Sequence, residues 1–317
     1  SFFTSGGTEG VNFFLRGLLE DFPNGHLVTS SVEHSCVVQT AAFLQKKGAQ
    51  VTYVPVGEWG APDPEAVACA ILPDTKLLCF TAANNETGVK SDVQALAEIA
   101  KRVKVPLVVD GVCWLGKESI VIPEGVSGLF FSGHKIFGPK GVGFCFCRKG
   151  WKGKPFLMGG EQEGKKRAGT ENVPGIFGLT QAIRLLREGQ VEISIQRIQQ
   201  LRDYFEMRLA YLFGDRVVVN GRGTRLCNTT NCSFLGVDGE SLLMALDMAG
   251  ISVSFGSACS SGGLERSRVL QNMGLPAERI RSALRFSFGR DNSQEEVERV
   301  LDCLKALVQK YSFGSLS

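Results

Sequence analysis

Short apolar runs of strand length alternate with amphipathic stretches of helical length through the first half of the chain. The expected strands are residues 26–30, 51–54, 76–82 and 105–110, and the expected helices are 9–19, 36–47, 64–72 and 92–103. Two more strand candidates, 129–132 and 142–147, flank a loop rich in Gly and Pro. Strands and helices in this alternation predict crossover units, and therefore a largely parallel sheet with helices on both faces.

The pattern turns helical from about residue 174 to 212, where apolar positions recur with a period near 3.6. Beyond this long connecting helix we expect strands at 216–219, 228–235 and 284–287, and helices at 240–249 and 294–311. The chain is therefore predicted to be α/β, with a large domain at 1–213 that includes the connecting helix and a smaller α+β domain at 214–317. A length of 317 residues is consistent with about two domains.

Composition and charge exclude several classes of protein. Lys+Arg 35 against Asp+Glu 32 leaves +3, which argues against nucleic acid or an anionic membrane as partner. The apolar runs are too short to span a bilayer, no charged-then-apolar leader opens the chain, and ten cysteines are too few for a disulfide scaffold. A cytoplasmic protein with reduced thiols is expected. Because Ser1 already opens a strand-like run, we also expect the natural N-terminus to lie further upstream.

The first candidate for chemistry is the turn at residues 4–9, where an apolar run meets Gly6, Gly7 and then Thr8 as a possible helix N-cap. Exposed amides and the positive end of a helix dipole make such a turn an anion site, usually for phosphate. An ordinary strand-to-helix turn would have the same pattern. No Lys follows the glycines, so this is not a Walker loop.

An acid and a lysine follow two of the expected strands. Asp110 ends the run 105–109, where it could meet a ligand or cap the next helix. Lys135 follows Ser132 and His134 at the end of the next strand and precedes a glycine loop. Lysine forms Schiff bases with carbonyl cofactors, and pyridoxal phosphate needs such a lysine, an acid for its pyridinium nitrogen and a phosphate cradle. Together with the glycine turn, these residues predict a pyridoxal-phosphate site.

Two residues in the second half are further candidates. Cys259 lies in a stretch of small residues, 255–263, so its thiol is either an accessible nucleophile or incidental to a loop. Arg285, within an apolar strand, either captures a carboxylate or is a solvent-facing edge charge. The other cysteines lie mostly in apolar runs. Cys145 and Cys147 have no second pair at zinc spacing, so no metal site is expected.

Taken in order, these motifs resemble the cysteine desulfurases, which belong to the fold-type I pyridoxal-phosphate transferases together with the class V aminotransferases and selenocysteine lyases. The resemblance covers essentially the whole chain. It is carried by residues 4–9, 32–34, 84–88, 109–110, 132–135, 167–172, 256–260 and 285–287.

The resemblance implies a role for each matched position. The implied cofactor-binding residues are Gly7, Thr8, His34, Asn85, Asp110, Cys113, Ser132, His134, Lys135 and Thr170. Among them Lys135 would be the Schiff-base lysine, and His34 would stack on the cofactor ring and do acid/base work. Thr170 would reach the phosphate of a partner subunit, which implies a homodimer. Asn85 and Arg285 would bind the substrate, with Arg285 on its carboxylate, and Cys259 would be the nucleophile that ends as a persulfide.

The implied reaction converts L-cysteine to L-alanine and passes the sulfur to an acceptor protein such as an iron–sulfur scaffold. A selenocysteine lyase would use much the same residues, and an inactive cofactor-binding partner protein is the alternative from another class. Three departures from the family pattern stand out. Cys113 replaces a glutamine, the stretch 160–166 lacks the usual glycine-rich form with an arginine, and the family begins some tens of residues earlier with a segment that completes the small domain.

Overall fold

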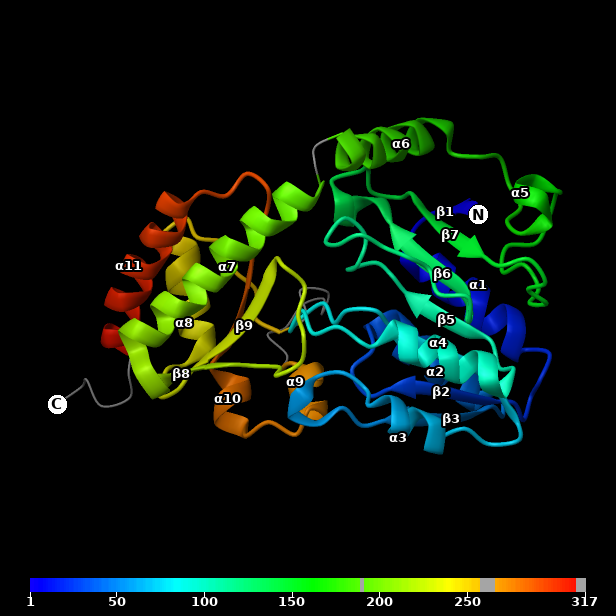
Figure 1. Ribbon diagram of the computed structural model, residues 1–317, viewed down its shortest axis with the longest axis horizontal. Helices are drawn as coiled ribbons and strands as arrows, with labels where there is room; N and C mark the ends of the chain where they lie inside the picture. Colours follow the sequence, from blue (N-terminus) through cyan, green and yellow to red (C-terminus); the bar gives the residue numbers. More distant parts are fainter. Residues whose placement is uncertain (189–190, 257–265, 312–317) are drawn as a thin grey trace. The chain divides into compact units, whose positions relative to one another are not determined.

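The computed structural model describes residues 1–188, 191–256 and 266–311, and it divides into two compact units. The first unit comprises Ser1–Pro55, Pro62–Ala83 and Ser91–Val191. The second comprises Val56–Ala61, Asn84–Lys90 and Glu192–Ser317. Figure 1 labels the elements of both units along the chain.

A seven-stranded sheet forms the frame of the first unit, in the order β1-β7-β6-β5-β4-β2-β3. Its strands are β1 (Phe2–Thr4), β2 (His26–Ser30), β3 (Gln50–Val54), β4 (Thr75–Thr81), β5 (Leu107–Asp110), β6 (Val126–Ser132) and β7 (Gly143–Cys147). Neighbours from β3 through β6 are parallel, whereas β7 and β1 join antiparallel at one edge. The predicted α/β class with a mostly parallel sheet is confirmed.

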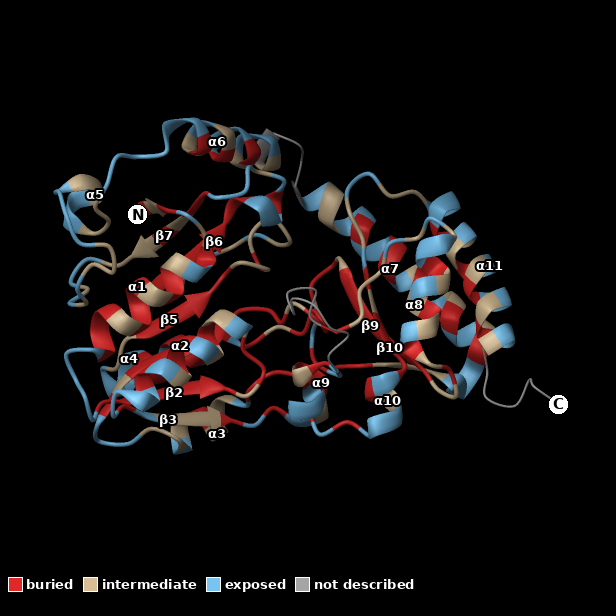
Figure 2. Ribbon diagram, turned by 180° about the vertical axis from the view of Figure 1, so that it is seen from behind, coloured by how far each residue is buried: buried red, intermediate tan, exposed pale blue. Residues whose placement is uncertain are grey.

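Helices cover both faces of this sheet. The α-helices of this unit are α1 (Gly7–Leu19), α2 (Ser35–Lys46), α3 (Pro64–Cys69), α4 (Val93–Val103), α5 (Gln162–Lys165) and α6 (Val173–Glu188). The two views show α1 and α2 on one face and α4 on the other (Figures 1 and 2). The faces of α1 and α2 that meet the sheet are apolar, and residues such as Phe14, Leu44 and Phe130 are almost completely buried there. Burial of this apolar surface stabilises the unit.

The second unit has a three-stranded antiparallel sheet in the order β10-β9-β8. Its strands are β8 (Val217–Val219), β9 (Thr229–Phe234) and β10 (Ala283–Ser287), and its α-helices are α7 (Val191–Phe213), α8 (Gly239–Met248), α9 (Arg268–Asn272), α10 (Ala277–Arg281) and α11 (Gln294–Tyr311). The core of this unit lies among the sheet, α7, α8 and α11, with Phe205, Phe234 and Leu301 at most 1% exposed. Within the described residues, no helix is long and apolar enough to cross a membrane.

The long helix belongs to a different unit from the one that its sequence suggests. The pattern assigns 174–212 to the first domain, but the structure forms α6 in the first unit and α7 in the second. The reason is that the apolar stripe of α7, with Leu201, Phe205 and Leu209, packs into the core of the second unit. Periodicity reveals that a helix has a buried face, and it does not reveal the partner of that face.

The short segment Asn84–Lys90 also belongs to the second unit, although the chain enters and leaves it from the first. Backbone hydrogen bonds join Lys90 N to Thr224 O and Leu226 N to Gly88 O. The side chain of Asn84 accepts from the amides of Glu86 and Thr87, which closes a tight turn. This turn therefore presents Asn85 within the second unit.

Candidate active site

The candidate site of the first unit lies at the carboxyl ends of adjacent parallel strands. Asp110 is the last residue of β5, and β6 pairs with it on one side and β4 on the other. Lys135 lies just beyond β6, on the short 3-10 helix Gly133–Ile136. This end of an open α/β sheet is where such folds bind ligands.

Asp110 and Lys135 have contrasting environments. The Asp110 side chain is buried, with 5% of the residue exposed, while Lys135 is exposed. Burial raises the pKa of Asp110 to about 6, opposed by the Val112 amide, which donates to Oδ1 at 2.9 Å, and by the nearby charge of Lys135. A buried acid therefore lies beside an accessible amine.

The glycine turn leads directly into α1, with Gly6 as N-cap instead of the expected Thr8. The helix begins earlier because Gly6 adopts φ 152°, which leaves Gly7 in the first helical position. The Gly7 amide donates to Ser132 Oγ at 2.8 Å, so the turn and the end of β6 are joined. A Cβ on Gly7 would lie 2.8 Å from Val112 Cγ2, so this position has no room for a larger residue.

A carboxylate on the first turn of α1 fastens this turn, a feature that the sequence analysis missed. Glu9 accepts from the Ser5 amide at 2.8 Å and from Arg167 Nε at 3.1 Å, and its side chain is only 8% exposed. A Glu in the first helical turn is a known capping signal, so the Ser5 contact was accessible to sequence reasoning. The partner Arg167 was not, because it lies 158 residues away.

His34 precedes α2 and serves as its N-cap through its ring. Nδ1 accepts from the Cys36 amide at 3.2 Å and lies 2.9 Å from Cys36 Sγ. Burial, with the charges of Asp110 and Glu33 nearby, raises the pKa of the Cys36 thiol. His34, Cys36 and Asp110 are therefore neighbours at the carboxyl end of the sheet.

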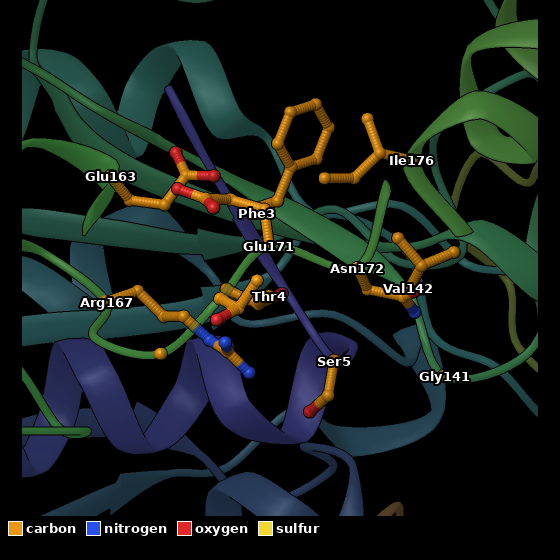
Figure 3. A pocket seen from close by; sticks show the side chains of 12 residues that line it. Phe3, Thr4, Ser5, Gly141, Val142, Glu163, Arg167, Glu171, Asn172 and Ile176 are labelled. Carbon is orange, nitrogen blue, oxygen red and sulfur yellow. The ribbon is translucent and has the colours of Figure 1, made fainter. Parts of the chain in front are cut away.

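Three other expected cofactor residues lie in the first unit with different exposures. Partial desolvation, with the charges of Lys135 and Lys140, lowers the pKa of His134 from its usual 6.5. Cys113 is half-buried in the turn after β5, and Thr170 is exposed. Thr170 helps to line a pocket of about 140 Å³ with residues such as Phe3 and Arg167 (Figure 3).

The expected substrate residues Asn85 and Arg285 come together in the second unit. Arg285 Nη1 donates to Asn85 O at 2.8 Å, and Nη2 donates to Ser254 Oγ at 3.0 Å. Arg285 Nε is buried and has no hydrogen-bond partner among the described residues. Buried polar groups in folded proteins nearly always have a hydrogen-bond partner. A buried donor without one is therefore suited to bind an anionic ligand.

Cys259 lies outside the described residues. The nine cysteines that the structure describes are all free thiols. Within the described part of the chain, no cluster of three or more His, Cys, Asp or Glu residues could hold a metal ion.

Known proteins are similar to this chain in both sequence and fold. The family model for aminotransferase class-V matches residues 2–300. The chain therefore belongs to the class-V aminotransferase family.

The similar curated proteins refine this assignment. The chain is 41% identical to the cysteine desulfurase IscS of Dictyoglomus turgidum over 97% of its own length and 79% of the relative's. It is 42% identical to the cysteine desulfurase IscS of Methanosarcina thermophila, over 98% and 77%. The resemblance to the cysteine desulfurases that the sequence indicates is confirmed.

Solved structures agree with the sequence relatives. A NifS-like protein superposes with a TM-score of 0.89 at 32% identity, covering 98% of this chain and 82% of that one. DndA from Streptomyces lividans superposes with a TM-score of 0.76 at 33% identity, covering 90% and 81%. The fold is therefore that of the NifS-like proteins, as expected for a fold-type I transferase.

Proposed function

We propose that this chain is a pyridoxal-phosphate-dependent cysteine desulfurase that converts L-cysteine to L-alanine and takes up the sulfur as a persulfide on Cys259. The observation that carries the proposal is the buried Asp110 beside the exposed Lys135, at the ends of neighbouring parallel strands. The relatives named cysteine desulfurase, which match nearly the whole chain, support the choice of reaction.

The residues of the first unit fit the cofactor. Asp110 is a buried acid whose pKa is raised despite the nearby charge of Lys135, and a pyridinium nitrogen would be a suitable partner for its carboxylate. The first turn of α1, which Gly7 and Ser132 hold in place, offers amides and the positive end of a helix to a phosphate. Thr8 follows Gly7 in the sequence, His134 precedes Lys135, and both are exposed. They would complete the phosphate ligands.

When bound, pyridoxal phosphate supplies an aldehyde that condenses with amines and a ring that accepts electrons from the substrate Cα. Lys135 Nζ would bond the aldehyde carbon until the substrate amine replaces it, and would then take the proton from Cα. Asp110, as a carboxylate, would hold the proton on the ring nitrogen. Cys113 stands where the family has a glutamine, and a thiol is a weaker donor to the ring's phenolic oxygen.

The residues of the second unit would bind the substrate. Arg285 Nε has no hydrogen-bond partner among the described residues, which supports a role on the substrate carboxylate, and the hydrogen bond from Nη1 to Asn85 O holds the guanidinium in place. Asn85 would contact the substrate and the cofactor through its side-chain amide.

The sulfur transfer balances without an outside oxidant. The Cys259 thiolate attacks the substrate sulfur, an S–S bond forms, and the bond between sulfur and Cβ breaks. The electron pair of that bond stays on Cβ, which takes a proton to become the alanine methyl group. One cysteine substrate and one Cys259 thiol therefore give one alanine and one persulfide.

We also propose a homodimer in which Thr170 serves the partner's cofactor phosphate, and transfer of the persulfide sulfur to an acceptor such as an iron–sulfur scaffold. The exposure of Thr170 supports the first point. A cytoplasmic location remains a prediction that rests on the reduced cysteines.

The activity is tested with Cys259→Ser in the cofactor-loaded protein. With L-cysteine and a reductant, the wild type should form alanine and sulfide in equal amounts, because the reductant releases the persulfide sulfur. Cys259→Ser should stop both products, since a hydroxyl is a poor nucleophile toward sulfur, while the visible absorbance of the cofactor remains.

Cys69→Ser is the matched control, because Cys69 is an exposed thiol outside the candidate site, and it should keep full activity. Sulfide production by Cys259→Ser at the wild-type rate would contradict the assignment. Selenide release from selenocysteine without sulfide release from cysteine would make the protein a selenocysteine lyase.

The cofactor lysine is tested separately, without turnover. Borohydride reduction of the loaded wild type should fix the cofactor to the peptide that contains Lys135, as detected by mass spectrometry. Lys135→Ala should abolish this modification, and Lys140→Ala, which removes another exposed lysine of the same loop, should leave it intact. A modified Lys140 peptide in the wild type would assign the covalent bond to Lys140 instead of Lys135.

A further inference from the structure

His34 carries hydrogen bonds that determine where its ring proton sits. As the N-cap of α2, its Nδ1 accepts the amide N–H of Cys36 at 3.2 Å, while its backbone carbonyl accepts from Val37 at 2.9 Å and Val38 at 3.2 Å. His34 is thus bound to the first turn of α2 by both its ring and its backbone.

An amide N–H can only donate, so Nδ1 must present a lone pair to it. In a neutral imidazole the single proton is then on Nε2. The end of α2 acts in the same direction, because the positive pole of a helix disfavours a second proton on a ring beside it.

The thiol of Cys36 adds a second donor to the same nitrogen. Its Sγ lies 2.9 Å from His34 Nδ1, and Cys36 is partly buried. Because burial and the charges of Asp110 and Glu33 raise the pKa of this thiol, it keeps its proton and can donate it to Nδ1.

We propose that Cys36, through its amide and its thiol, holds His34 as the Nε2–H tautomer, so that His34 acts on the cofactor site as a hydrogen-bond and proton donor and not as a base. The role at the cofactor rests on the proposed function, whereas the tautomer is a property of the chain alone. Cys36 is a positioning residue in this scheme, and proton removal from the substrate is left to Lys135.

The chain offers an internal comparison, because it contains only three histidines. His26 is buried, whereas His34 is half-buried, and the two ring nitrogens of His26 each lie 2.8 Å from a threonine hydroxyl, of Thr75 and of Thr52. A hydroxyl can donate or accept, so nothing in the His26 contacts selects a tautomer. His34 differs in having a partner that can only donate.

The test is nitrogen-15 NMR of the full chain labelled at histidine, first without cofactor and then loaded. Long-range proton–nitrogen correlations report for each ring which nitrogen is protonated. His34→Asn identifies the His34 signals by their loss, and it keeps the helix cap because the Asn side-chain oxygen is also a good N-cap acceptor.

At neutral pH we expect His34 Nδ1 at the position of an unprotonated nitrogen and Nε2 at that of a protonated one, with and without cofactor. A protonated Nδ1, or averaged signals from both tautomers, would overturn the proposal. Because the cofactor-free spectrum involves no turnover, a failed desulfurase assay would leave this result unaffected.

Cys36→Ala and Cys36→Ser separate the thiol from the amide, which both variants keep. Loss of the thiol in Cys36→Ala should move the Nδ1 signal toward that of an imidazole nitrogen with fewer hydrogen bonds, without changing the tautomer. The hydroxyl of Cys36→Ser should return it toward the wild-type position. An Nδ1 signal that stays fixed in both variants would remove the thiol from the scheme.

Discussion

At the scale of single residues, the protonation of Asp110 bears directly on the candidate site. The pKa of about 6 lies above the ordinary 3.8 because burial penalises the charged form. Between these two values the folded chain holds a proton that the unfolded chain has released. This contribution to stability is complete below the ordinary pKa and is lost as the pH rises through about 6.

We therefore predict that the cofactor-free chain loses up to about 3 kcal/mol of unfolding free energy through Asp110 between pH 4 and 6, at about 1.36 kcal/mol per pKa unit. Asp110→Asn should remove this slope and be the more stable protein above pH 6. Urea unfolding at several pH values, taken as the difference between variant and wild type, measures the effect.

Asp215→Asn is the matched control, because Asp215 is an exposed carboxylate outside the candidate site. A flat difference curve for Asp110→Asn would mean that the carboxylate already has a full counter-charge in the folded chain. In that case the Asp110 carboxylate would not be available to pair with the pyridinium nitrogen of a cofactor.

The positions of some candidate site residues could be expected from the sequence for a clear physical reason, while their roles stay predictions. Asp110 and Lys135 could be found because each follows an apolar strand, and parallel strands bring their carboxyl ends to one edge. The ring contacts of His34 could not, since Ser, Thr, Asp and Asn dominate at N-caps and a histidine gives no such signal. The sequence therefore gives no indication that Cys36 is the hydrogen-bond partner of His34.

At the scale of elements, α1 carries two ion pairs in different surroundings. Glu9 near its start pairs with Arg167, and both side chains are largely buried, at 8% and 24% exposed. Arg16 and Glu20 at its end pair at 2.7 Å but are 30% and 46% exposed. Water screens the second pair far more than the first.

We predict that Glu9→Gln lowers the unfolding free energy by about 1–3 kcal/mol, because the charged hydrogen bonds to Arg167 and Ser5 are weakened and the Arg167 charge loses its partner. The matched variant Glu20→Gln should cost no more than about 0.5 kcal/mol. Chemical denaturation of the cofactor-free proteins gives both values. Equal losses in the two variants would show that Glu9 does not secure the turn.

The parallel strands follow from their patterns to within three residues at each end, and α11 spans the expected 294–311. The antiparallel edge of β7 and β1 was not predicted, because local alternation does not specify the neighbour or the direction of a strand. The short helices α9 and α10 were missed because five residues are too few to show a period.

At the scale of the whole molecule, the proposed homodimer gives the sharpest test of Thr170. The native mass should be twice the 34.3 kDa of the chain. Thr170→Ala should weaken cofactor binding at the partner's site, and Lys135→Ala should abolish activity at its own. A mixed dimer of the two variants should contain one site with both residues intact, so mixing should restore activity.

Desulfurase activity measured before and after refolding the two variants together provides the readout, with each variant refolded alone as control. Activity that rises only in the mixture supports the exchange of Thr170 between subunits. A mixture no more active than the average of its parents would place Thr170 at the site of its own chain, or away from the cofactor altogether.

The segment Asn84–Lys90 limits which contacts can form while the chain is being synthesised. Arg285, which donates to Asn85 O, comes 200 residues later in the chain. At a synthesis rate of about 5–20 residues per second, Asn85 leaves the ribosome some 10–40 seconds before its partner exists. The strands on either side can pair during that interval, whereas the hydrogen bond to Asn85 O can form only after Arg285 has been synthesised.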